Sequence, residues 1–235
     1  MRKIFQLFLV LLSIGVTHAQ LQGADSQSNL NSLSGGEGMF RSFDNRFKGI
    51  EGSPLLFDKY LSGKIFFNNG ISVQNKRMNY DAYTQELIIE RENKEFLIDS
   101  KLIKEFHIYK DGDTLFFEKF TNDKGKLIFY QSLWNRKINL FIFHSKTVLQ
   151  PTNTGAYSSG KIYSQFEQAA SYYYRTPAGK SQLIKNKKSV LNLFRSHQDV
   201  IENFIKENDT NFNKEEDLIK LFSYINSKEI NSTGD

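Results

Sequence analysis

Histidine, the commonest metal ligand and a frequent general acid and base near neutral pH, is sparse in this sequence. Four histidines occur in 235 residues, and three of them, His107, His144 and His197, lie beyond the first twenty positions. No two of them stand at the spacing that places two side chains on one helical face, and the pattern H-E-x-x-H is absent. We therefore interpret them as separate structural or surface residues, and we predict no metal site and no cofactor.

Nucleophilic and carboxylate chemistry also lack a recognisable motif. The chain has no cysteine and no G-x-S-x-G turn, so the sequence shows neither a thiol nucleophile nor a nucleophile elbow. Asp111-Gly112-Asp113 begins like a calcium loop, but a strand pattern follows at once, and a hairpin turn is the better interpretation. We predict no catalytic residues. Whether the protein is an enzyme stays open, and the sequence leans against it.

Positive charge gathers in one segment near the C-terminal end. This segment comprises Lys180, Lys185, Lys187, Lys188 and Arg195. Basic residues at a helix start oppose the helix dipole, which hints at a different reason for their presence. Two interpretations stay open: an ordinary solvated face, which is the commoner case, and contact with an anionic surface such as lipid headgroups.

The elements that would position these residues are mostly strands. Short runs rich in Phe, Tyr, Ile and Leu alternate with turn signals such as Asn69-Gly70, a strong hairpin dipeptide. The predicted strands are 64–67, 71–80, 86–91, 95–99, 105–110, 114–120, 126–134, 136–149, 161–175 and 181–185. This spacing predicts an antiparallel β-meander that forms a curved sheet, a sandwich or an open barrel. Before it, residues 39–63 have irregular apolar spacing and are expected to be loop and short helix.

The C-terminal part changes to helical periodicity. Apolar residues recur on one stripe over 187–207, which predicts one helix or two with a break near Ser196. A further helix is expected after Asn213, which precedes Glu216 at capping-box spacing. The fold class is therefore α+β, a β-meander followed by a C-terminal helical hairpin that packs on the sheet.

The N-terminus has the pattern of a secretory signal peptide. Arg2 and Lys3 precede an apolar run that ends at Thr17-His18-Ala19, a small-residue cleavage site. The run is too short to span a bilayer, and no later stretch is long enough, so we expect no transmembrane span. The predicted divisions are a signal peptide (1–19), a disordered leader (20–38), a β-rich domain (39–186), a helical hairpin (187–227) and a disordered tail (228–235). Without cysteine, the protein is not a lipoprotein.

Composition limits the partners that the chain can have. The formal net charge is +5, and removal of Arg2 and Lys3 with the signal peptide leaves 29 basic against 26 acidic residues. This balance is too mild to indicate a nucleic-acid binder. Hydrophobic residues make up 39% of the chain, which is enough for a core and argues against wholesale disorder.

Several segments, taken in order, resemble a known family. They are Gly52-Ser53-Pro54, Tyr60-Leu61-Ser62-Gly63-Lys64, MNYDAYTQELII, SYYYR, KNKKSVLNLF and NKEEDLIKLFSYINS. This combination resembles a family of uncharacterised secreted proteins typical of Bacteroidota, over residues 52–227. The resemblance implies a Gram-negative envelope, hence a periplasmic or outer-surface location, and it supplies no catalytic residues.

Three classes of function remain open from the sequence. The first is a non-catalytic exported protein that binds an envelope protein or lipid, which we favour because catalytic signatures are missing. The second is a carrier of an apolar ligand or lipid in a β-lined cavity. It requires that one face of 115–120 or 140–143 be left unpacked. The third is a hydrolase of envelope polymers, which needs a cluster of perturbed carboxylates or histidines. The oligomeric state stays open.

The signal peptide generates the first testable prediction. Export of the full chain in a Gram-negative host should yield a product whose first residue is Gln20, because cleavage follows the small residue Ala19. N-terminal sequencing and the intact mass of the periplasmic product measure this directly. An uncleaved chain in the membrane fraction would contradict it.

Overall fold

We describe the fold from a computed structural model of the chain. The structure describes residues 40–42, 47, 49–122, 125–133, 139–150, 163–176 and 179–230. The expected signal peptide and leader lie outside the described residues. Among the described helices, none is long and apolar enough to cross a bilayer.

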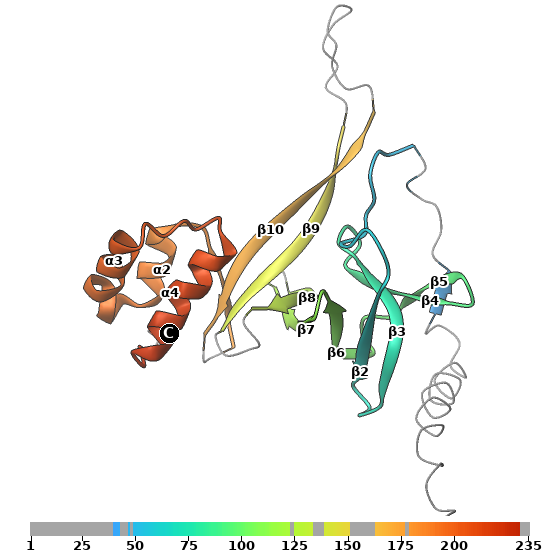
Figure 1. Ribbon diagram of the computed structural model, residues 1–235, viewed down its shortest axis with the longest axis horizontal. Coiled ribbons are helices and arrows are strands. Elements are labelled where there is room, and N and C mark those ends of the chain that lie inside the picture. The colour runs from blue at the N-terminus through green and yellow to red at the C-terminus, as the bar shows by residue number, and fades with distance from the viewer. Residues whose placement is uncertain are drawn as a thin grey trace, which may run out of the picture.

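The described chain contains one eleven-stranded antiparallel sheet (Figure 1). Its strands are β1 (Phe40–Ser42), β2 (Leu61–Phe67), β3 (Ser72–Asp81), β4 (Glu86–Arg91), β5 (Lys94–Ile98), β6 (Ile103–Lys110), β7 (Asp113–Thr121), β8 (Leu127–Ser132), β9 (Leu140–Leu149), β10 (Gln165–Arg175) and β11 (Ser181–Ile184). The fold class predicted from the sequence is confirmed: an antiparallel β-meander, curved and open, followed by helices.

The sheet consists of two meanders joined side by side. The strand order is β1-β5-β4-β3-β2-β6-β7-β8-β9-β10-β11, so the chain runs outward from β2 to β5 and then returns to place β6 beside β2. Two-residue turns connect β4 to β5 and β6 to β7. At the β6–β7 turn, Asp111 and Gly112 have φ of +51° and +89°, and Lys110 pairs with Asp113. These are the dihedrals of a two-residue hairpin, as the sequence predicts for this site.

Curvature brings distant strands together on the concave face of the sheet. Tyr80 of β3 lies 5.8 Å from the rings of Phe106 and Phe117 and 6.3 Å from Phe129 of β8, measured between ring centroids. Phe106 and Phe117 are stacked at 4.6 Å. All four rings are at most 1% exposed. Each contributes about 2–3 kcal/mol by leaving water, so this cluster stabilises the curved form.

The segment before β2 is an extended loop rather than a short helix. Leu55 forms an isolated bridge with Asp81, and Glu51 forms one with Gln165 of β10. The expectation of a helix there is wrong for the described residues 49–60. The segment contributes its backbone to two distant strands and so satisfies hydrogen bonds that a helix would satisfy internally.

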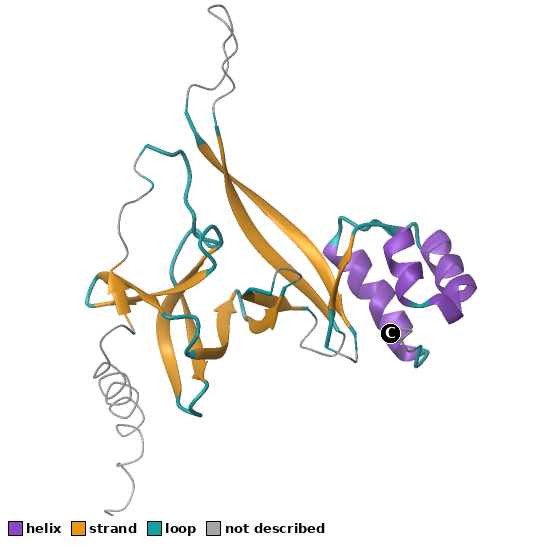
Figure 2. Ribbon diagram, turned by 180° about the vertical axis from the view of Figure 1, so that it is seen from behind, coloured by secondary structure: helices purple, strands orange, loops and turns teal. Residues whose placement is uncertain are grey.

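The β9–β10 hairpin is the longest pair in the sheet and extends past its neighbours (Figures 1 and 2). Its register runs from Leu140 opposite Tyr174 to Leu149 opposite Gln165. On one side β8 pairs with β9 only at Phe141 and Ile142. On the other side β11 pairs with β10 only from Tyr172 to Arg175. The outer half of the hairpin therefore projects from the sheet.

The C-terminal helices gather at one end of this hairpin (Figure 2). They are α2 (Lys187–Leu193), the 3-10 helix η2 (Arg195–His197), α3 (Gln198–Glu207) and α4 (Glu215–Ser227). The predicted break near Ser196 is confirmed by η2. The helices share one core with the ends of β9, β10 and β11, through Leu140, Ile142, Tyr174 and Ile184. The helical part thus packs on the sheet, as expected.

Two predicted details at the helix ends are wrong. Lys214, not Asn213, is the N-cap of α4, and no side chain caps it. Asn213 instead donates its backbone N–H to the side chain of Asn211, 2.9 Å away, within the preceding turn. Ile230 is only 8% exposed and packs in the helical core, so the ordered chain continues past residue 228.

Both faces of the central strands pack against protein. In β9, Leu140 and Ile142 belong to the helical core, whereas Phe141 and Phe143 pack on the opposite face with Phe120 and Tyr130. In β10, Tyr172 and Tyr174 face the helices and Tyr173 faces the other way. The alternation expected for a strand holds. Within the described part of the chain, neither face of 140–143 is left as the wall of an apolar cavity.

Gly63 provides a test of how tightly the sheet is assembled. A Cβ at this position would overlap the carbonyl oxygen of His107 on β6 and lie 2.8 Å from Sδ of Met78 on β3. We expect Gly63→Ala to lower the free energy of unfolding by about 2–4 kcal/mol, because backbone on one side cannot yield. Urea denaturation followed by circular dichroism measures the loss.

Gly112→Ala is the matched control for this substitution. Gly112 has φ of +89°, and a Cβ added there would meet no atom within 4 Å, so only the backbone conformation is penalised. The expected loss is about 1 kcal/mol. Equal losses in the two variants would contradict the close approach at Gly63.

Candidate functional site

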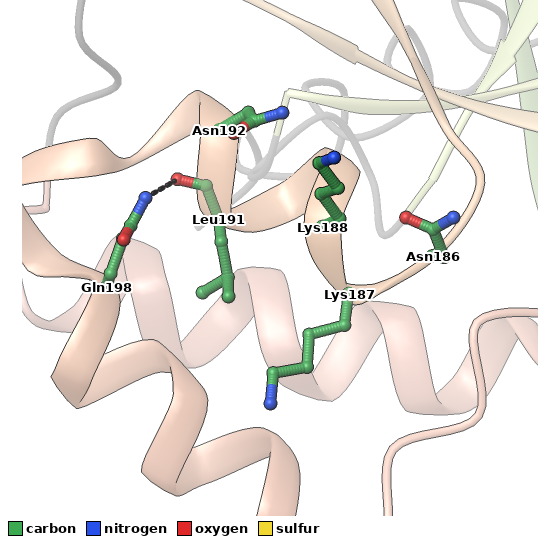
Figure 3. Close-up of a pocket in the computed structure, with 6 residues that line it drawn as sticks. All are labelled: Asn186, Lys187, Lys188, Leu191, Asn192 and Gln198. Carbon is green, nitrogen blue, oxygen red and sulfur yellow. Dashed lines mark hydrogen bonds between the residues drawn. The ribbon is translucent and has the colours of Figure 1, made fainter.

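The predicted lysine segment surrounds the start of α2. Its residues do not all come together. Lys187 and Lys188 line a surface depression of about 450 Å³ with Asn186, Leu191, Asn192 and Gln198 (Figure 3). Lys185 immediately precedes this site. Lys180 lies at the opposite end of β11, and Arg195 lies beyond the C-terminal end of α2.

A capping box fixes the start of α2 and so the position of the lysines. The Asn186 side chain accepts a hydrogen bond from the Ser189 backbone N–H at 3.0 Å, and Ser189 Oγ accepts one from the Asn186 N–H at 3.1 Å. Ser189 Oγ also accepts from the Lys185 N–H at 2.9 Å. The sequence reasoning missed this cap, although Asn186 and Ser189 stand at the spacing that marks one.

Opposite charge partly balances the site. Lys187 Nζ pairs with the carboxylate of Glu202 on α3. Gln198 donates its side-chain amide to the Leu191 carbonyl at 3.1 Å and closes one wall of the depression (Figure 3). Lys185 and Lys188 are exposed. The site therefore presents ammonium and amide donors to solvent, which suits binding of a carboxylate or phosphate group.

The three histidines occupy separate environments, as the sequence predicts for structural residues. His107 lies between the rings of Phe66 and Phe116, at 4.8 and 4.7 Å between centroids. His197 is exposed on η2 beside Ser196. Among the residues that the structure describes, no group of three or more His, Cys, Asp or Glu side chains is arranged to hold a metal ion.

A polar junction joins the β3–β4 turn to β9, and no pattern in the sequence indicated it. Lys146 donates its backbone N–H to the Ala82 carbonyl at 2.9 Å. Gln85 donates its side-chain amide to the carbonyls of Ala82 and His144, at 2.6 and 3.0 Å. Its side-chain oxygen accepts from Tyr80 Oη at 2.9 Å. Burial raises the pKa of Tyr80, so this phenol stays a donor.

His144 occupies the most constrained position in this junction. Its Nε2 lies 2.7 Å from the side-chain oxygen of Gln131, so Nε2 carries the proton and donates. Its Nδ1 is buried, and no group of the described residues forms a hydrogen bond with it. Burial lowers the pKa of His144 to about 4, because the charged imidazolium would lose its hydration there. The junction therefore favours neutral histidine, a structural rather than a proton-transfer role.

Comparison of the chain with protein-family models, with curated proteins and with solved structures finds no match in any of the three. Function is therefore inferred from the geometry of this chain.

The buried histidine generates a pH prediction. The folded-state pKa lies below the unfolded value near 6.5, so the stabilising effect of neutral His144 is complete above pH 6.5 and is lost as pH falls toward 4. Between pH 7.5 and 5.0, the wild-type chain should lose about 2 kcal/mol more unfolding free energy than His144→Gln, which cannot titrate.

Urea denaturation at a series of pH values measures this difference. His197→Gln makes the same replacement at an exposed histidine and is the matched control. Parallel profiles for the wild type and His144→Gln would show that His144 is not held neutral by the fold.

Proposed function

We propose that the protein is a non-catalytic, exported interaction module of the bacterial cell envelope. The observation that carries the proposal is the β9–β10 hairpin. Its outer half projects from the sheet, and residues 167–170 of β10 are exposed on both faces. A strand that buries neither face contributes little to the core. Binding to a partner therefore explains the presence of this exposed stretch better than a contribution to the stability of the fold does.

The surroundings of the hairpin support a role in binding. A three-ring cluster of Phe47, Tyr83 and Phe166 lies where the projecting half meets the β3–β4 turn, with ring centroids 5.2 to 5.7 Å apart. The Lys146 ammonium donates to the carbonyls of Ser53 and Leu55, at 2.9 and 2.5 Å. These contacts hold the hairpin in one orientation, and a fixed orientation lowers the entropy cost of association.

The experiment that tests the proposal is sedimentation of the purified chain, from Gln20 onward, with envelope fractions of a Gram-negative bacterium of the Bacteroidota. Saturable cosedimentation that disappears after the envelopes are treated with protease is the expected result, because the proposed partner is an envelope protein. Binding that survives protease and requires Lys185 and Lys188 would assign the lysine segment to anionic lipid instead.

Other results would favour the competing functions. Release of soluble fragments from envelope polymers would support a hydrolase. A lipid that remains bound through detergent-free purification and extracts into organic solvent would support a carrier. A chain that stays in the supernatant with none of these activities would overturn the proposed interaction role.

A further inference from the structure

The outer side of β10 contains a short stretch of unpaired strand edge. At one end, Glu51 occupies the edge: its N–H donates to the Ser164 carbonyl at 2.8 Å, and its carbonyl accepts from the Phe166 N–H at 2.9 Å. At the other end, β11 occupies the edge from Tyr172 onward. Among the described residues, no strand pairs with this side of β10 between the two, over residues 167–171.

The alternation of an antiparallel strand identifies which groups face this edge. The Phe166 N–H donates to Glu51, on the side of β10 that faces away from β9, and Tyr172 pairs with β11 on that same side. Because backbone groups alternate sides along a strand, the even-numbered residues of β10 direct their N–H and C=O groups away from β9. Gln168 and Ala170 therefore present N–H and C=O groups to the open edge. An exposed row of this kind is a template for another strand.

The edge lacks several of the devices that block such pairing in other sheets. Residues 167–171 read Glu-Gln-Ala-Ala-Ser, with no proline, no lysine and no bulge in the register with β9. Ala169 and Ala170 are small and exposed, so they leave room for the side chains of an added strand. The outward side of these five residues spans about 16 Å.

A second copy of the chain does not fit this edge. Antiparallel pairing of two β10 strands about Ala169 would place residue 166 of one copy opposite residue 172 of the other. That position is already occupied by Ile184 of β11. Since β10 continues as a strand from Gln165 to Arg175, it cannot turn away at the ends of the open stretch. A short extended segment can enter and leave there.

Charge differs between the two ends of the open edge. Glu51 and Glu167 are exposed at one end. At the other end the chain leaves β11 at Ile184, opposite Tyr172, and continues directly into Lys185, with Lys188 in the first turn of α2. Glu215 of α4 lies close enough to Tyr172 to help raise its pKa, so this end combines the two lysines with one carboxylate. Among the described residues, a bound segment meets these lysines near Ala170 and Ser171 and the carboxylates of Glu51 and Glu167 at the other end.

We propose that residues 167–171 of β10 bind an extended segment of a partner protein by strand addition, with an acidic side chain of that segment placed toward Lys185. Backbone hydrogen bonds to Gln168 and Ala170 would hold the segment, and the lysines would select its charge and its placement along the edge. This inference rests on the proposed interaction role and names the surface and the chemistry of the partner.

The test uses nuclear magnetic resonance of the ¹⁵N-labelled chain with a defined probe. The probe is a short, end-blocked peptide of alternating threonine and valine whose first residue is aspartate, which antiparallel pairing with β10 places beside Ser171; the control peptide has lysine at that position. We expect shift changes and slowed exchange at the Gln168 and Ala170 amides, with the aspartate peptide bound more tightly. Lys185→Glu should raise the Kd of the aspartate peptide by about threefold, which is the effect of one exposed ion pair. Lys180→Glu, at the far end of β11, should leave this Kd unchanged.

Ala170→Pro removes one outward N–H without removing a bond to β9, and we expect it to abolish binding. Three results would overturn the inference: no change at Gln168 and Ala170, equal binding of the two peptides, or self-association of the chain through this edge. If envelope sedimentation persists in Lys185→Glu and Ala170→Pro, the interaction role stands and this edge is not its site. If circular dichroism shows that Ala170→Pro is unfolded, the comparison of Lys185→Glu with Lys180→Glu tests the inference in its place.

Discussion

The packing of Tyr80 against Phe106, Phe117 and Phe129 is the interaction on which the rest of the structure depends. Three strands separate β3 from β8 in the sheet, so these rings can meet only if the sheet is strongly curved. The phenol of Tyr80 is satisfied at the same time by Gln85, which lets a polar atom stay inside an aromatic core. Burial of the rings stabilises the curvature, and the hydrogen bond sets where the β3–β4 turn lies.

Because the sheet is curved, the β3–β4 turn lies beside β9. Once Ala82 and Gln85 reach Lys146 and His144, the middle of β9 is held by backbone and amide hydrogen bonds that no neighbouring strand supplies. The loop before β2 adds further bonds to both strands of the hairpin. The outer half of the β9–β10 hairpin is thus held at Lys146 and at Phe166 by segments other than its neighbouring strands.

The C-terminal helices cover one end of the sheet. It shares a core with the ends of β9–β11 and ends the sheet on that side, because β11 leads directly into the capped start of α2. The same connection brings Lys185 to within one residue of the last β10–β11 pair. Charge that looks like an ordinary basic stretch along the chain therefore lies at the end of an open strand edge, where it can influence what binds.

The sequence by itself determined the local elements: period-two runs of aromatic residues, turn pairs such as Asp111-Gly112, and the helical stripe with its break near Ser196. These depend on neighbours a few residues apart, which is why they could be predicted. The expected start of α4 is wrong because the Asn211 side chain accepts the Asn213 N–H in a turn that precedes the helix, and Lys214 is the N-cap. Only the tertiary structure decided the strand order, the curvature, the burial of His144 and which lysines adjoin the β10 edge. Each of these depends on contacts between residues far apart in the chain, such as Tyr80 with Phe129 or Gln85 with His144, and no local pattern encodes which distant partner will be met.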